Sequence, residues 1–322
     1  MRSVDFRNGK IFLLDQRKLP YSEKYIECKS IKQVFNAIKN MVVRGAPAIG
    51  VAAAYGLSIS KNFVKDCEFL RKARPTAVDL NNAIEFMIRE NKKGKKSIDS
   101  AKRWHKKIIE KTKKISENGA SLIKSNSNIL LHCNAGMIAT AGEGTALGAV
   151  VYAKENGKKI FVYVNETRPR IQGALTSWEL GKNRIKHRVI VDSSAGFFME
   201  NGKVDCVFVG ADRVLKNGDF ANKIGTYSLA VIAKENKIPF YVCFPISTFD
   251  SKTKNGKKIK IEERSEKEVL EILGKKVYGK NTKALNPAFD ITPSKYVTAY
   301  ITEYGIHKKP KEIGKIWKNI PE

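Results

Sequence analysis

The sequence lacks the features that mark secreted proteins, membrane proteins and zinc proteins. Its 322 residues include only five cysteines, an odd number, and none of them falls in a CxxC or CxH spacing. This pattern argues against a disulfide framework or a structural zinc site and favours a reducing compartment. The first ten residues, MRSVDFRNGK, have no apolar signal-peptide core, and no apolar run is long enough for a bilayer. We therefore expect a cytoplasmic protein with no membrane partner.

Acidic residues are also scarce. There are 32 Asp and Glu against 60 Lys and Arg, which gives a net charge of +28. Such a charge suits a polyanionic partner. However, the lysines are interleaved with helix-like and loop-like sequence, without a regular alternation of basic and aromatic residues and without a nucleic-acid-binding signature. The pattern favours a solvated, lysine-rich surface and argues against a nucleic-acid partner.

The motifs of the common cofactor sites are missing as well. No GxGxxG motif follows the first strand of the expected sheet, and there is no Walker loop. The four histidines have no metal-ligand spacing, and they form no cluster with carboxylates along the chain. We therefore expect no dinucleotide, no metal and no other cofactor.

The pattern of strands and helices predicts an α/β protein of two domains. Residues 1–124 read as a small strand-plus-helix domain, in which Ser30 is the N-cap of the first helix. Residues 125–322 alternate strand and helix, which argues for a parallel, doubly wound sheet. In this second domain we expect strands at residues 128–132, 159–164, 189–191, 204–209, 240–243 and 296–302, and helices at residues 139–156, 173–182, 195–201 and 224–235.

The stretch of residues 204–225 carries the first candidate site. Residues 204–209 form an apolar run, typical of a strand buried on both faces, and Asp212 lies just past its end. Ligands of open α/β sheets bind outside such strand ends. Asn222 and Lys223 are predicted to follow a polar loop and open the next helix, where an amide and an ammonium suit a phosphate. The alternative is that Asp212 caps a turn and Lys223 is solvated.

Three strand ends should converge if the sheet is parallel. They carry Cys133, then Glu166, Arg168 and Gln172, and finally Asp212. Because Cys133 precedes a predicted helix start, we expect its thiol to have a lowered pKa. The alternative is a structural cysteine, which we assign to the other four. Gln172 is placed to reach a ligand hydroxyl, whereas Glu166 and Arg170 suit an ion-pair loop.

An arginine in the first domain is a further candidate. Arg44, in RGA, comes just before a helix of small residues expected at residues 48–60. The guanidinium and the free backbone N–H groups would both lie at the positive end of that helix, which favours anion binding. The alternative is that Arg44 pairs with a surface carboxylate.

Six motifs together give the chain a family resemblance. They are RGAPAIG (residues 44–50), RPTAV (74–78), HCNAG (132–136), ETRPRIQG (166–173), GADRVLKNGDFANKIGT (210–226) and NPAFDITP (286–293). With LLDQRKLP near the start, they make the chain resemble the methylthioribose-1-phosphate isomerases over nearly its whole length. That family shares a superfamily with the regulatory alpha, beta and delta subunits of the translation-initiation exchange factor and with the archaeal ribose-1,5-bisphosphate isomerases.

The resemblance implies an aldose-ketose isomerase of methionine salvage, which converts 5-methylthioribose 1-phosphate into 5-methylthioribulose 1-phosphate. It also implies a Rossmann-like second domain, a homodimer and no cofactor. Matched by motif, Cys133 is the catalytic cysteine and Asp212 the proton donor. The substrate-binding positions are Arg44, Gly45, Ala46, Arg74, Gln172, Asn222 and Lys223.

The chemistry makes the expected roles more specific. Since O1 of this substrate is esterified, the ring opens only if the C1–O4 bond breaks, which calls for an acid at O4. Asp212 would be that acid if burial raised its pKa. Hydrogen must then move from C2 to C1, either through an enolate with Cys133 as base or as a hydride with Cys133 stabilising the transition state. The sequence leaves both routes open.

Two alternative functions stay open. A ribose-1,5-bisphosphate isomerase would need a second cationic cluster, and the runs after HCN and GAD look more like the methylthioribose branch. A noncatalytic regulatory subunit would need neither Cys133 nor Asp212, so the presence of both argues against it.

Overall fold

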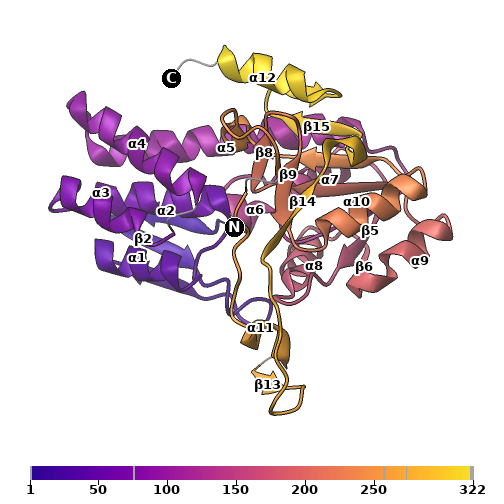
Figure 1. Cartoon of the computed structure of the whole chain (residues 1–322). Helices are drawn as coiled ribbons and strands as arrows, with labels where there is room; N and C mark the ends of the chain where they lie inside the picture. The colour runs from indigo at the N-terminus through magenta and orange to yellow at the C-terminus, as the bar shows by residue number, and fades with distance from the viewer. Residues whose placement is uncertain (1, 75–76, 257–258, 273, 320–322) are drawn as a thin grey trace.

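The computed structural model describes residues 2–74, 77–256, 259–272 and 274–319. Pro75 and Thr76 of the RPTAV motif therefore lie outside the described residues, while Arg74 is within them. Figure 1 shows the whole chain, with the N-terminal elements on one side and the larger sheet on the other.

The N-terminal part (residues 2–124) is a three-stranded antiparallel sheet with five helices around it. Helix α2 lies at its centre, because its Ala- and Gly-rich surface lets α4 and α5 pack closely. Ser30 is the N-cap of α1, as predicted, and its side chain accepts from the Gln33 N–H. The strands, in the order β1-β2-β3, are Val4–Arg7, Lys10–Leu14 and Tyr25–Cys28, and the helices α1 to α5 are Ile31–Lys39, Ala46–Ser58, Phe63–Arg71, Val78–Lys92 and Ser97–Ser121.

The C-terminal part (residues 125–319) is built on a seven-stranded sheet in the order β16-β15-β10-β7-β4-β5-β6. Six strands are parallel, and only β16 at one edge runs antiparallel. The strands are β4 (Ser127–Leu131), β5 (Ile160–Asn165), β6 (His187–Ile190), β7 (Cys206–Gly210), β10 (Phe240–Cys243), β15 (Ala299–Thr302) and β16 (Gly305–His307). The predicted α/β class with a Rossmann-like parallel sheet is confirmed.

The strand order fixes where a ligand can bind. The chain starts the sheet at β4, adds β5 and β6 on one side, and then returns to add β7, β10 and β15 on the other. The order therefore reverses between β4 and β7, which pair in register with Leu131 opposite Phe208. Open α/β sheets bind ligands in the crevice outside such a reversal point. The segments after β4 and β7 carry Cys133 and Asp212.

One predicted helix of the C-terminal part is wrong. Residues 139–156 form two helices rather than one, α6 (Met137–Thr140) and α7 (Ala146–Glu155). The break follows from the backbone at Ala141 and Gly144, which have φ values of 56° and 91° and so cannot continue a right-handed helix. Further helices are α8 (Gln172–Lys182), α9 (Ala195–Glu200), α10 (Thr226–Glu235) and α12 (Pro310–Lys318).

The polar loop predicted after Asp212 is also wrong. It is a hairpin of β8 (Arg213–Leu215) and β9 (Phe220–Lys223), so Asn222 and Lys223 end a strand and α10 begins only at Thr226. The Asn217-Gly218 dipeptide forms its turn, with Gly218 at φ 87°. The hairpin joins β11 (Phe249–Asp250) and β14 (Phe289–Thr292) in a second sheet of order β11-β8-β9-β14.

A long excursion links β11 to β14. This arm (residues 251–288) runs in two limbs past the front of the molecule and ends in a protrusion at the bottom of Figure 1. Near its tip it contains α11 (Lys267–Leu270) and the short hairpin of β12 (Glu271–Ile272) and β13 (Lys275–Lys276). Residues 259–262, on the limb that leaves β11, lie at the candidate site.

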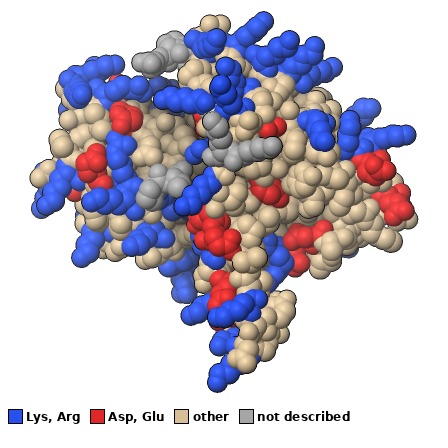
Figure 2. Space-filling view, viewed as in Figure 1, with Lys and Arg blue, Asp and Glu red and all other residues tan. Residues whose placement is uncertain are grey.

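The charge of the chain is visible on its surface. Figure 2 shows Lys and Arg spread over much of the visible face, with Asp and Glu in smaller groups. In the described ranges, no helix has both the length and the apolar character needed to cross a membrane. One apolar core lies mainly in the N-terminal part and two lie around the seven-stranded sheet. The domain boundary at residue 124 stays a prediction.

Candidate active site

A cavity of about 450 Å³ opens at the point where the strand order reverses. Segments from both parts of the chain line it: the start of α2, the residue before α4, the loops after β4 and β7, the start of α8, and the end of β9. All nine residues predicted for the site line this one cavity: Arg44, Gly45, Ala46, Arg74, Cys133, Gln172, Asp212, Asn222 and Lys223.

Cys133 has a constrained backbone. Its φ is 64°, in the left-handed region that non-glycine residues rarely adopt. Its N–H donates to Thr167 Oγ1 at 2.9 Å, and its carbonyl oxygen accepts from Thr176 Oγ1 at 2.7 Å. These two threonines therefore hold the residue from both sides. Among the five cysteines, Cys133 alone is partly exposed, while the other four are buried.

The expected lowering of the pKa of Cys133 is wrong. Burial raises the pKa of its thiol, although the charges of Lys223 and Arg44 act in the opposite direction. The expectation relied on a long helix beginning next to the cysteine. Helix α6 instead begins at Met137 and has only four residues, so it has little dipole to offer. Burial in the free site therefore favours the protonated thiol.

Asp212 faces the cavity from the loop after β7. Its backbone is fixed, because its N–H donates to the Ala221 carbonyl at 2.9 Å. The side chain is open to the cavity. Nevertheless the protein surrounds the carboxyl, and this burial raises its pKa, while Lys223, Arg74 and Arg44 act against the rise. The direction of this shift agrees with what an acid at the site requires.

Cationic side chains converge on the same space. Arg44 stands at the N-terminus of the thirteen-residue helix α2, as expected. Lys223 comes from the end of β9, where its Nζ donates to the Ala288 carbonyl at 2.9 Å and lies 4.4 Å from the centre of the Phe289 ring. Burial lowers the pKa of Lys223, and the nearby Cys133 and Asp212 oppose this. The ammonium of Lys223 thus reaches the site from the end of a strand, and not from a helix N-terminus as predicted.

Gln172 has unused hydrogen-bonding capacity. It is the first residue of α8, its side chain is buried, and it lines the cavity. Within the described residues its Oε1 has no hydrogen-bond partner. A buried acceptor without a partner costs free energy, so this atom is ready for a donor from a ligand.

Gly45 packs closely against the C-terminal part of the chain. It is the N-cap of α2 with φ 95°, and a Cβ at this position would lie 2.1 Å from the Ala139 carbonyl oxygen. No side chain fits in this space. The turn that carries Arg44 is thus packed directly on α6 of the C-terminal part.

Substituting this glycine tests the contact. We expect Gly45→Ala to lower the free energy of unfolding by more than the 1–3 kcal/mol of left-handed strain alone, because the new methyl group also collides with backbone. Gly94→Ala is the matched control, since Gly94 has φ 68° but no atom within 4 Å of the added Cβ. Thermal and denaturant unfolding measure both. Equal losses in the two variants would contradict the close approach.

The loop after β5 differs from its expected role. Glu166 and Arg168 do not line the cavity, and Arg168 instead donates to the Val269 carbonyl of the arm at 2.9 Å. Arg170 does line it, but its Nη1 lies 3.9 Å from Glu268 Oε1 rather than pairing with Glu166. The expected ion-pair loop is therefore wrong, because the arm supplies the partner.

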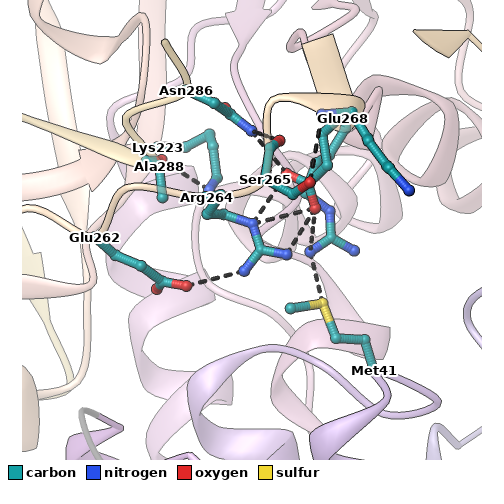
Figure 3. A network of polar contacts seen from close by, with 10 residues as sticks. Met41, Lys223, Glu262, Arg264, Ser265, Glu268, Asn286 and Ala288 are labelled. Carbon is teal, nitrogen blue, oxygen red and sulfur yellow. Dashed lines mark hydrogen bonds and ion pairs between the residues drawn. The ribbon is translucent and has the colours of Figure 1, made fainter. Parts of the chain in front are cut away.

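The arm is fastened at this same place. Figure 3 shows Arg264 between Glu268 and Glu262, with Asn286 of the returning limb beside Glu268. Arg264 Nη2 donates to Glu268 Oε1 at 2.6 Å, and Asn286 Nδ2 donates to Glu268 Oε2 at 3.1 Å. The arm thereby adds residues that the sequence did not suggest for the cavity, such as Ile259 and Ile261. No periodic pattern in this segment pointed to them.

His132 is next to the catalytic candidate but is engaged elsewhere. Its Nε2 lies 2.9 Å from the Ile224 carbonyl oxygen and its Nδ1 3.2 Å from Asn165 Nδ2. Burial lowers its pKa, which keeps the ring neutral. Both nitrogens are used, so the ring bonds to the end of β5 and to the segment before α10 instead of pairing with Cys133. Nor do three or more potential metal ligands cluster anywhere in the described parts of the chain.

Known proteins are similar to this chain over almost its whole length. Residues 42–309 match the model of the initiation factor 2 subunit family. The methylthioribose-1-phosphate isomerase of Caldicellulosiruptor saccharolyticus is 47% identical over 97% of each chain. The structure of 5-methylthioribose 1-phosphate isomerase from Pyrococcus horikoshii superposes with a TM-score of 0.93 at 38% identity, covering 99% of this chain and 96% of that one. A structure titled translation initiation factor eIF-2B, subunit delta, from A. fulgidus gives 0.89 at 39% identity over 99% of each chain.

Proposed function

The chain belongs to the initiation factor 2 subunit family and, within it, to the methylthioribose-1-phosphate isomerases, and on this premise we propose how its residues perform the reaction. The enzyme is an isomerase of methionine salvage. It converts the cyclic 5-methylthioribose 1-phosphate into the open 5-methylthioribulose 1-phosphate. The observation that carries the assignment of roles is the meeting of Cys133, Asp212 and three cations at the reversal of the strand order.

Asp212 is the acid that opens the ring. As the C1–O4 bond breaks, O4 takes the carboxyl proton, and the positive charge left at C1 is shared with the phosphate-bearing oxygen. An acid can do this at neutral pH only if it still holds its proton, and burial raises the pKa of Asp212. The side chain of Asp212 opens onto the cavity, so a substrate that fills the cavity shields the carboxyl from solvent.

Cys133 acts at the carbon atoms. The hydrogen on C2 moves to C1, and the C2 hydroxyl becomes the ketone as it gives up its proton, which replaces the proton that Asp212 gave to O4. The thiol either removes the C2 proton and returns it to C1, or stabilises a direct hydride transfer. The raised pKa of the thiol means that it becomes a base only after it has lost its own proton. The threonine contacts fix the backbone of Cys133, from which the thiol reaches the cavity in either route.

The remaining residues bind the substrate. Arg44, Arg74 and Lys223 hold the phosphate by charge-assisted hydrogen bonds, with the backbone of Gly45 and Ala46 at the start of α2 completing the cradle. The unpartnered Oε1 of Gln172 accepts from a sugar hydroxyl. Asn222, whose Nδ2 donates to Thr226 Oγ1 at 3.0 Å, turns the rest of its amide toward the ligand.

Turnover of two substrates side by side tests the function. Purified protein should convert 5-methylthioribose 1-phosphate and should act far more slowly on ribose 1,5-bisphosphate. If the protein converts only the bisphosphate, the assigned site residues stand but the assigned substrate and pathway are wrong. If folded protein converts neither, the regulatory-subunit alternative, favoured by the name of the A. fulgidus structure, takes its place.

We also infer that the enzyme is a homodimer. Strand β6 is an unpaired edge of the large sheet, and three apolar side chains on it and just after it are exposed: Val189 by 50%, Val191 by 54% and Phe197 by 62%. Exposed apolar residues beside an open strand edge mark a surface that a partner covers. A second copy of the chain supplies the same edge and the same residues.

Light scattering on eluted protein tests the dimer. Wild type should have about twice the chain mass of 36.1 kDa. The variant Phe197→Lys should shift the mass toward one chain, because it places a charge in the apolar patch. Tyr21→Lys is the matched control, since Tyr21 is 83% exposed but lies in the N-terminal part. A monomeric wild type contradicts the inference.

The location is inferred from the cysteines. None of the five is paired, which favours a reducing compartment and hence the cytoplasm. Fractionation of the source cells should recover the enzyme with cytoplasmic markers, and recovery in a membrane or external fraction would contradict this.

A further inference from the structure

One buried carboxylate near the cavity has no place in the reaction. Glu179 lies in the middle of α8, and only 2% of it is exposed. Its Oε1 accepts from Asn134 Nδ2 at 2.7 Å, and its Oε2 accepts from the Ile138 N–H at 3.3 Å. Burial raises its pKa, while these donors and the charge of Arg44 favour the ionised form. A buried carboxylate with this many donors is held in one orientation.

The partner of Glu179 connects it to the substrate site. Asn134 Nδ2 donates to Glu179 and, at 3.2 Å, to Thr176 Oγ1. The amide oxygen is therefore left on the other side, where it accepts from Arg44 Nη2 at 3.0 Å. In the described part of the chain, Asn134 is the only side chain to which this guanidinium donates. The orientation of one amide thus determines where Arg44 points.

The surroundings leave Glu179 no freedom to move. A Cβ at Gly136 would lie 2.3 Å from Glu179 Oε1, so the backbone that follows Cys133 packs directly on the carboxylate. Helix α8, which carries Glu179, also carries Gln172 and the Thr176 that holds the Cys133 carbonyl. Helix α8 therefore supports Cys133, Gln172 and, through Asn134, Arg44.

We propose that Glu179 is a positioning residue for phosphate recognition, acting through Asn134 to aim Arg44 into the cavity. The proposal rests on the function above, in which Arg44 binds the substrate phosphate. Glutamine cannot take over this role. It has a single acceptor, but both Asn134 Nδ2 and the Ile138 N–H require one. Asn134 then turns its amide and presents Nδ2 to Arg44, which places one donor against another.

The test measures substrate binding and anion binding separately. The first readout is KM and kcat for 5-methylthioribose 1-phosphate. The second is the concentration of inorganic phosphate that protects Cys133 from iodoacetamide at a fixed alkaline pH, which reports on this cysteine because the other four are buried. For Glu179→Gln we expect both KM and the protecting concentration to rise about 10- to 100-fold, as the loss of a charged hydrogen bond predicts, with kcat changed far less.

A double-variant cycle separates positioning from general damage. Arg44→Ala should show the same rise, and adding Glu179→Gln to it should cause little further change, since the two residues act as one unit. Glu303→Gln is the matched control, because Glu303 is also buried and also accepts a backbone N–H, that of Ile246 at 2.8 Å. It should leave phosphate protection unchanged. Additive effects of the two variants would overturn the proposal.

The remaining outcomes are also decisive. A folded Glu179→Gln enzyme with unchanged KM and unchanged protection refutes the role of Glu179. If this variant does not fold, Asn134→Ala breaks the same connection, and its effect must likewise vanish in the Arg44→Ala background. If the wild type is inactive but phosphate still protects its Cys133 from iodoacetamide, the proposed function is refuted while the positioning role stands. An active wild type beside an unaffected variant removes only the positioning role.

Discussion

Replacing Cys133 with serine is expected to lower kcat by about 10²- to 10⁴-fold, the usual contribution of a group that transfers protons, while KM changes little. A hydroxyl is nearly the size of a thiol but is a much weaker acid. The threonine contacts hold the backbone of residue 133 rather than its side chain, so they survive the change. Steady-state kinetics with 5-methylthioribose 1-phosphate provides the measurement.

The control for this variant is Cys28→Ser. Cys28 is buried in β3, far from the cavity lining, so its replacement should reduce stability but leave kcat as it was. A Cys133→Ser enzyme that turns over like wild type would exclude Cys133 from the chemistry. Wild-type turnover in deuterated water then separates the two routes. Deuterium at C1 would exclude a fully shielded hydride shift, because it requires a base whose proton exchanges with solvent.

Replacing Asp212 with asparagine is expected to lower kcat by a similar factor, about 10²- to 10⁴-fold, because the amide keeps the shape but has no proton to give to O4. The loop should be unaffected, since Asp212 holds it through a backbone bond to Ala221. An Asp212→Asn enzyme with near-normal kcat would mean that another group opens the ring.

The pH profile gives a second view of Asp212. Its pKa is raised by burial, and an acid works only while it is protonated. Activity should therefore be retained below this raised pKa and be lost as pH rises through it. Cys133 gives the opposite sign if it is a base, since activity would then increase as pH rises through the raised pKa of the thiol. The limb lost at higher pH should be missing from the residual activity of Asp212→Asn, and its persistence there would assign it to a different group.

The sequence predicted the site better than it predicted the segments that support it. Apolar runs that end in polar residues placed Cys133 and Asp212 at strand ends, and the parallel sheet brings such ends together. The order of the strands could not be predicted, because it depends on contacts between residues that are far apart in the sequence. The Asn217-Gly218 dipeptide is a hairpin signal, and the hairpin it forms is the reason that Lys223 ends a strand instead of opening a helix.

Other parts of the site had no signal to find. Glu179 lies mid-helix, where a glutamate ordinarily faces solvent, and only the folded chain shows it beneath Asn134. The arm has no period of either strand or helix, so its contribution to the cavity through Ile259 and Ile261 could not be foreseen. The pKa of Cys133 depended on the length of α6, and helix ends are what sequence patterns fix least well.

The packing of Gly45 on Ala139 couples the contact between the two parts of the chain to ligand binding. Gly45 is the neighbour of Arg44, so the backbone that holds the two parts of the chain together is continuous with the group that binds phosphate. A ligand in the cavity must then strengthen that junction by RT ln(1 + [L]/Kd), which is about 2.7 kcal/mol at a hundred times Kd. Conversely, a change that weakens the packing of Gly45 on Ala139 lowers the affinity for the ligand. The free energy of unfolding of this enzyme should therefore rise with the concentration of its substrate.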